Sequence, residues 1–169
     1  MPSDLDHLVS SSSCLCNSDQ MQGDITSLEY LNLSSNTIKS CFNSLTNLTA
    51  LRTLLMDNNR MHFLPEKLGN LTALEVISVR SNELDLLPQS IVQCTALKKV
   101  NFQDNHLRRL PQELGTLPHL EILNVAANSM KSLPYSLGFS KTLKEFIVIP
   151  PPSSPPPAPA PIPHISISW

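Results

Sequence analysis

A 23-residue period governs most of this 169-residue chain. Asparagines recur at this spacing from residue 36 to residue 128, and leucines recur at it from residue 28 to residue 143. The polar letters between them change from copy to copy, whereas the apolar letters are kept. A unit this short cannot bury its apolar side chains alone, but stacked copies share one continuous core. The period therefore predicts an array of stacked units.

Each copy carries apolar residues at fixed places, which we count from its first leucine. That leucine is Leu28, Leu51, Leu74, Leu97, Leu120 or Leu143. The fourth and sixth places are apolar in all six copies, the eleventh is apolar in the first five, and the ninth is the asparagine. This is the L-x-x-L-x-L-x-x-N-x-L pattern of leucine-rich repeats, written five times in phase and followed by a shortened sixth copy.

The spacing within a copy predicts its local structure. Alternating apolar letters around the fourth and sixth places indicate a short strand with one buried face, and stacked copies place these strands side by side and parallel, about 4.8 Å apart. We expect the asparagine amides to bond to backbone groups of adjacent turns and to form a ladder. This asparagine ladder comprises Asn36, Asn59, Asn82, Asn105 and Asn128.

The second half of each copy must return along the other side of the array. Repeats two to five carry a Leu-Pro pair there, and proline suits an irregular path with room for one helical turn at most. Glycine follows at Gly69, Gly115 and Gly138, where we expect a tight turn to need a permissive backbone. The predicted fold is an α/β-type solenoid curved toward its strands, with a parallel sheet on the concave face and an irregular, short-helical convex side.

The two ends depart from the pattern. We interpret residues 1–22 as a degenerate repeat or cap that is partly disordered, residues 23–149 as the repeat domain, and residues 150–169 as a disordered proline-rich tail. Pro151 stands where the next ladder asparagine belongs, and no C-terminal cap is visible. The sixth strand is therefore expected to present an uncovered edge.

The letters between the buried residues of each strand are expected to point out of the concave sheet. Exposed apolar, aromatic and arginine side chains among amides suit a protein interface. The third, fifth and seventh places supply the candidate binding residues, which are Tyr30, Asn32, Leu55, Asp57, Val76, Ser78, Arg80, Lys99, Asn101, Gln103, Ile122 and Asn124. The alternative is that such scattered apolar side chains have no function.

The second place alternates in charge through all six repeats: Glu29, Arg52, Glu75, Lys98, Glu121 and Lys144. Parallel strands in register put each acid beside a base, so this charge row is expected to neutralise itself. We interpret it as a feature that fixes register and aids solubility, the alternative being a charged stripe that binds a partner.

The net charge and the composition of the chain exclude several classes of function. A net charge of −2 argues against a nucleic-acid or membrane-surface binder, and no run approaches the roughly 18 apolar residues of a membrane span. The N-terminus lacks the basic and apolar regions of an export signal, and the 4 cysteines are scattered, so a reducing cytoplasmic location is expected. The 5 histidines occupy unrelated places, and we expect no metal, cofactor or catalytic site.

The stretches "LRTLLMDNNRMHFLPEKLGNLTA" and "LKKVNFQDNHLRRLPQELGTLPH" carry the motif LxxLxLxxNxLxxLPxxLGxLxx almost intact. This motif resembles the intracellular leucine-rich repeats of the Ras-group type, found in Ras–Raf scaffold, Ras-suppressor-like, plant Ras-group and Scribble-type proteins. The resemblance covers residues 23–149. It implies a non-catalytic protein-binding solenoid in cytoplasmic signalling, with a small GTPase or a signalling kinase or phosphatase as candidate partner.

Two functional hypotheses follow. The first is a monomeric adapter or scaffold that binds proteins through its concave sheet. The second is a truncated isoform or fragment of a larger signalling protein (kinase, phosphatase or GTPase-linked), in which these repeats are the regulatory or targeting domain. The abrupt end of the sixth repeat and the half-repeat before Gly23 favour the second origin.

Overall fold

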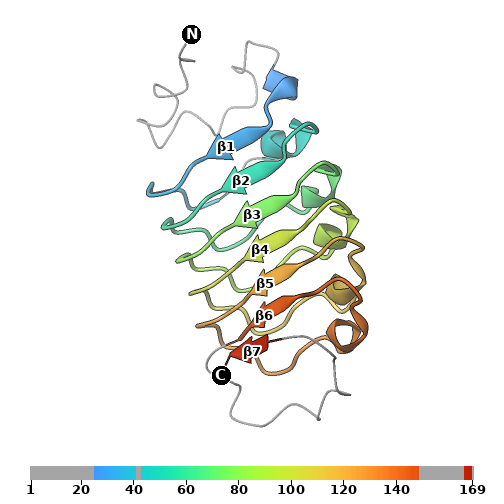
Figure 1. Ribbon diagram of the computed structural model, residues 1–169. Helices are drawn as coiled ribbons and strands as arrows, with labels where there is room; N and C mark the ends of the chain where they lie inside the picture. Colours follow the sequence, from blue (N-terminus) through green and yellow to red (C-terminus); the bar gives the residue numbers. More distant parts are fainter. Residues whose placement is uncertain (1–24, 41–42, 149–165, 169) are drawn as a thin grey trace.

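The computed structural model describes residues 25–40, 43–148 and 166–168. Its strands form one seven-stranded sheet in which sequence order and spatial order coincide, and every pairing is parallel. Figure 1 shows the strands stacked side by side along the molecule. The strands are β1 (Tyr30–Asn32), β2 (Thr53–Leu55), β3 (Val76–Ser78), β4 (Lys99–Asn101), β5 (Ile122–Asn124), β6 (Glu145–Ile147) and β7 (Ser166–Ser168).

The register between β1 and β6 follows the sequence period. Leu31 pairs with Leu54, and Leu54 pairs with Ile77, so the partners in each pair stand one period apart. From β2 to β6 the central residue of each strand is buried, and those of all six strands belong to the hydrophobic core or pack against it. The leucines at the first place of each repeat belong to the same core or pack against it. Each repeat therefore buries the apolar surface of its neighbours. The predicted solenoid with a parallel sheet is confirmed.

The return side of each repeat holds a short 3-10 helix, on the side of the solenoid away from the strands (Figure 1). Each helix is three to five residues long, so the shorter ones keep to the expected limit of one turn and the five-residue ones slightly exceed it. The prolines of the Leu-Pro pairs are buried just before these helices, where a missing amide hydrogen costs nothing. The helices are η3 (Ile25–Ser27), η4 (Asn43–Asn47), η5 (Leu68–Asn70), η6 (Gln89–Gln93), η7 (Leu114–Thr116) and η8 (Tyr135–Phe139).

The asparagine ladder is present and binds each repeat to the one before it. Asn82 Nδ2 donates to the carbonyl of Met56 at 3.0 Å, and Asn82 Oδ1 accepts the amide hydrogen of Met61 at 3.0 Å. The same amide also donates to two carbonyls of its own turn, those of Val79 and Arg80. Asn59, Asn105 and Asn128 repeat this arrangement. Among the residues that the structure describes, Asn36 donates to the carbonyls of Leu33 and Ser34 in its own turn.

The residue before each ladder asparagine adopts a left-handed backbone conformation. Its φ lies between 52° and 59° in all five repeats, at Ser35, Asn58, Ser81, Asp104 and Ala127. This conformation turns the chain sharply out of the strand and aims the asparagine amide into the turn. Asparagine and aspartate tolerate it, whereas alanine is disfavoured. The repeat pattern by itself did not predict this requirement.

The glycines on the return side have a different role from the one expected. None of the described glycines has a positive φ, so no turn there requires glycine for its conformation. Instead, a Cβ on Gly115 would lie 2.3 Å from the carbonyl carbon of Ser136, and a Cβ on Gly69 would lie 2.6 Å from the carbonyl oxygen of Ser90. The backbone of the next repeat fills that space. These two glycines therefore set the close approach of successive repeats.

The C-terminal edge of the sheet also differs from expectation. Within the proline-rich tail, the structure describes only Ser166–Ser168, and these residues form β7 beside β6, with Phe146 paired to Ile167. The expectations of a tail without structure and of an uncovered sixth strand are wrong for these three residues. The expected N-terminal region at residues 1–22 lies outside the described residues, as does the remainder of the tail.

Candidate protein-binding surface

The predicted binding residues lie together on the face of the sheet opposite the core, which we call the strand face. The register places the third-place residues in one row, running from Tyr30 through Thr53 and Val76 to Lys99 and beyond. The fifth-place residues form a second row, and those of the seventh place follow where each strand ends. The parallel sheet therefore joins side chains from six repeats into one surface.

Exposure varies along the strand face. Tyr30 is 55% exposed, and Asn32, Arg80 and Lys99 are also exposed. The apolar residues Leu55, Val76 and Ile122, expected to be exposed, are half-buried because their neighbours in adjacent strands cover part of each side chain. The remaining predicted residues are half-buried as well, except Ser78, which is buried at 8% exposure.

Several polar residues of the strand face are engaged in internal hydrogen bonds. Ser78 Oγ donates to Asp57 Oδ1 at 2.6 Å, and the same oxygen accepts the backbone amide of Arg80 at 2.8 Å. Asn101 Oδ1 accepts the amide of Gln103, two residues on, and thereby turns the end of its strand. Asp57 and Ser78 therefore stabilise the surface, which reduces their availability to a partner.

Two cationic side chains in the middle of the strand face, Arg80 and Lys99, are available to bind a partner. Arg80 and Lys99 make no side-chain ion pair within the part of the chain that the structure describes, and both are exposed. Tyr30 provides an aromatic group with a polar tip at the N-terminal end of the same face. An exposed aromatic, an unpaired arginine and half-buried aliphatic side chains are typical anchors of protein interfaces.

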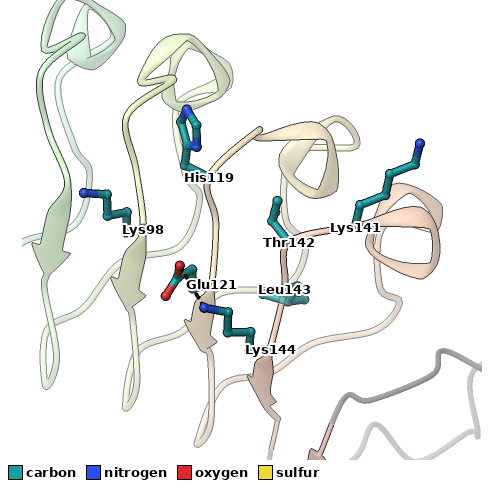
Figure 2. A pocket seen from close by; sticks show the side chains of 7 residues that line it. All are labelled: Lys98, His119, Glu121, Lys141, Thr142, Leu143 and Lys144. Carbon is teal, nitrogen blue, oxygen red and sulfur yellow. Dashed lines mark ion pairs between the residues drawn. The ribbon is translucent and has the colours of Figure 1, made fainter.

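The charge row runs beside the strand face and pairs as predicted. Glu75 accepts from Lys98 Nζ at 2.6 Å and from Arg52 Nη1 at 2.8 Å, and these two hydrogen bonds lower the pKa of Glu75. Lys144 Nζ lies 3.0 Å from Glu121 Oε1, and this hydrogen bond lowers the pKa of Glu121. Figure 2 shows Glu121 facing Lys144, with Lys98 on the neighbouring strand and Lys141 pointing away. The row is largely neutralised from within, which supports its structural interpretation.

Four large exposed side chains lie outside the set of binding residues predicted from the sequence. Phe63 and Leu86 occupy the thirteenth place of adjacent repeats and are 59% and 47% exposed. Tyr135 and Phe139 lie on η8, with ring centroids 4.7 Å apart. Comparison of these places across the repeats would have revealed all four, because most equivalent residues are polar.

The described ranges, 25–40, 43–148 and 166–168, contain few features of any other kind of site. In those ranges no group of three His, Cys, Asp or Glu side chains could hold a metal ion, and no helix has the length and apolar character to cross a membrane. Cys94 is buried with Sγ 3.3 Å from the carbonyl of Leu68, and burial raises its pKa to about 12. This thiol therefore stays protonated and packs as part of the core.

Comparisons with known proteins agree with this architecture. The family model "Leucine Rich Repeat" matches residues 27–48. A solved structure of a leucine-rich repeat protein from Leptospira interrogans is 25% identical and superposes with a TM-score of 0.65. The match covers 69% of this chain and 30% of that chain, so this chain spans less than a third of its length. A comparison with curated proteins finds no significant match.

Leucine-rich repeat solenoids typically present an extended surface to a protein partner. Here the register of the strands, the repeated asparagine bonds and the structural match lead to the same fold. The chain is a leucine-rich repeat solenoid, with six strands spaced by the 23-residue period and a seventh supplied by its C-terminal residues.

Proposed function

We propose that this protein is a non-catalytic binding module that takes a protein partner on its strand face. The observation that carries the proposal is the continuity of this surface across the sheet, with Tyr30, Leu55 and Arg80 accessible on three adjacent strands or at their ends. The neighbouring charge row is already paired, so a partner gains most from these three anchors.

The wider role we propose is that of an adapter or scaffold in cytoplasmic signalling, acting as a monomer. The Ras-group type of repeat motif supports this role and makes a small GTPase or a signalling kinase or phosphatase the candidate partner. Arg80 and Lys99 suit an acidic patch on that partner, since neither has an ion pair of its own within the described ranges.

The test is affinity capture with the full chain, followed by titration of each captured protein. We expect Tyr30→Ala, Leu55→Ala and Arg80→Ala each to weaken binding by at least about 1 kcal/mol, which is about fivefold. Gln89→Ala and Gln112→Ala are the matched controls, because both residues are exposed on the return side. Circular dichroism of each variant verifies its fold. Loss of binding in the two controls, with the strand-face variants unaffected, would show that the return side is the interface.

A further inference from the structure

Two of the exposed apolar side chains, Phe63 and Leu86, stand on one flank of the solenoid, at the turns that follow the strands. Their exposed fractions are 59% and 47%. Both occupy the thirteenth place, which is polar in the other repeats, as in Ser40, Arg109 and Ser132. We call these two residues the apolar pair. We call the surface around them, formed by the tenth, twelfth and thirteenth places of the first five repeats, the turn flank.

Backbone hydrogen bonds hold the turn flank together across the repeats. In repeats two to five the tenth-place amide donates to the eleventh-place carbonyl of the preceding repeat at 2.9 to 3.0 Å, as Arg60 does to Ile38. The eleventh-place side chains beneath this surface belong to the core or pack against it. Figure 1 shows these turns stacked one beside another beyond the arrowheads of the strands. The side chains of the turn flank therefore project from a fixed backbone, which lowers the entropic cost of binding.

The turn flank is basic, although the net charge of the chain is −2. It carries five of the chain's 12 lysines and arginines but only two of its 14 acidic residues. These five cations are all exposed, and none makes an ion pair with another described residue: Lys39, Arg60, Arg108, Arg109 and Lys131. The last three, which we call the basic group, lie on repeats four and five, where the turn flank has no acid.

The two acids of the turn flank separate the basic group from the other two cations. Both acids belong to the third repeat. Glu83 Oε2 lies 3.5 Å from His62 Nε2, and Asp85 is exposed. A nucleic acid or an anionic membrane is attracted by a continuous basic field, and these carboxylates would repel it in the middle of the turn flank. The interruption therefore favours a protein ligand over either of these polyanions.

The apolar pair and the basic group define the chemistry of that protein ligand. Exposed apolar side chains are suited to anchor a partner, and unpaired cations select acidic side chains. The two features are neighbours, because the apolar pair lies on repeats two and three and the basic group begins on repeat four. We propose that the turn flank binds an acidic segment of a protein partner, with apolar side chains on the apolar pair and carboxylates on the basic group. This site is separate from the strand face.

The test titrates the full, isotope-labelled chain with the peptide Leu-Phe-Gly-Asp-Glu-Asp and with the reversed sequence, and follows the backbone amide resonances. The two sequences cover both directions in which a segment can cross the repeats. We expect at least one of them to shift the amides of residues 60–63, 83–86 and 106–109. Replacing its acids by amides, or its apolar residues by serine, should weaken binding about fivefold or more. Shifts confined to the strand face, or no shifts with either peptide, would overturn the proposal.

Two substitutions separate the apolar contribution from the charged one. Phe63→Ser and Arg109→Ser each introduce the residue that stands at the thirteenth place in Ser40 and Ser132, so the fold should be kept. Each should weaken binding of the peptide about fivefold. Added salt should reduce the difference between Arg109→Ser and the unaltered chain, because it screens the charge, and should leave the effect of Phe63→Ser.

Tyr135→Gln and Lys67→Ser are the matched controls, because they remove an exposed ring and an exposed cation from the return side. Each introduces a residue found at the same place of another repeat, Gln112 and Ser90. Both controls should bind the peptide as the unaltered chain does, and equal losses in controls and variants would contradict the proposal. A single-stranded oligonucleotide or phosphatidylserine vesicles that shift the same amides more strongly than the peptide would also overturn it, since the turn flank would then be a polyanion site.

Discussion

The backbone amide of Gly115 donates to Ser136 Oγ at 3.0 Å, and Ser136 Oγ in turn donates to the carbonyl of Gln112. This pair joins η7 to η8 through a serine of one repeat and a glycine of the other. Gly69 and Ser90 make the same contact two repeats earlier, at 3.3 Å. Because glycine has no side chain, the hydroxyl and the backbone of the serine can approach the glycine backbone this closely.

Gly115→Ala should therefore destabilise the protein, because its methyl group would overlap backbone atoms of the next repeat. Overpacking of this kind costs about 1–3 kcal/mol. Gly138→Ala is the matched control, since none of the described atoms lies within 4 Å of the position of its Cβ. Urea denaturation should show a lower midpoint for the first variant alone. Equal midpoints for both would exclude close packing as the reason for the glycine.

Asn82→Ala should lower the free energy of unfolding by about 1–3 kcal/mol, because it leaves buried backbone groups of two repeats without partners. Asn36→Ala should cost less, since Asn36 is only partly buried whereas Asn82 is 7% exposed. Chemical denaturation of both variants provides the comparison. If Asn36→Ala is as damaging as Asn82→Ala, the burial of the ladder asparagine does not set the cost of removing it.

Ala127→Asn should stabilise the protein. Ala127 has a φ of 52°, a left-handed conformation that asparagine adopts more readily than alanine. The expected gain is about 0.5–1 kcal/mol. The reverse change, Asn58→Ala at the equivalent place, should cost a similar amount, since Asn58 has a φ of 55°. Thermal or urea unfolding measures both, and a loss of stability in Ala127→Asn would contradict the account.

The charge row should make stability depend on pH in acid. The pKa of Glu75 is lowered in the folded protein by its hydrogen bonds to Lys98 and then Arg52, so its contribution is fully present above the usual carboxyl pKa of 4.5. That contribution is lost as pH falls through the lowered folded value. In Glu75→Gln the free energy of unfolding should be smaller than wild type at pH 7 in low salt, and the two proteins should converge at strongly acidic pH. A difference that persists unchanged in acid would mean that packing, and not charge, is responsible.

Much of the fold could be predicted from the sequence, because it depends on the spacing of apolar residues and asparagines within each repeat. The apolar letters around Leu54, Ile77 and Val100 place a strand in each repeat, and equal spacing aligns the strands in register. The ladder role of Asn82 and the pairing of Glu75 with Arg52 and Lys98 follow from the same period. Identical spacing in successive layers leaves little freedom for other arrangements.

Other features were decided only when the layers were stacked. Gly115 has no positive φ, so its backbone conformation does not require glycine. Glycine is required there because Ser136 of the next repeat lies too close for a side chain. The burial of Ser78 depends on Asp57 in the neighbouring repeat, and the exposure of Tyr135 and Phe139 on the orientation of η8. The pairing of Ser166–Ser168 with β6 lies outside the 23-residue period. The sequence by itself determined the repeating contacts, whereas distances between layers and non-periodic pairings were set by three-dimensional packing, which one-dimensional spacing does not encode.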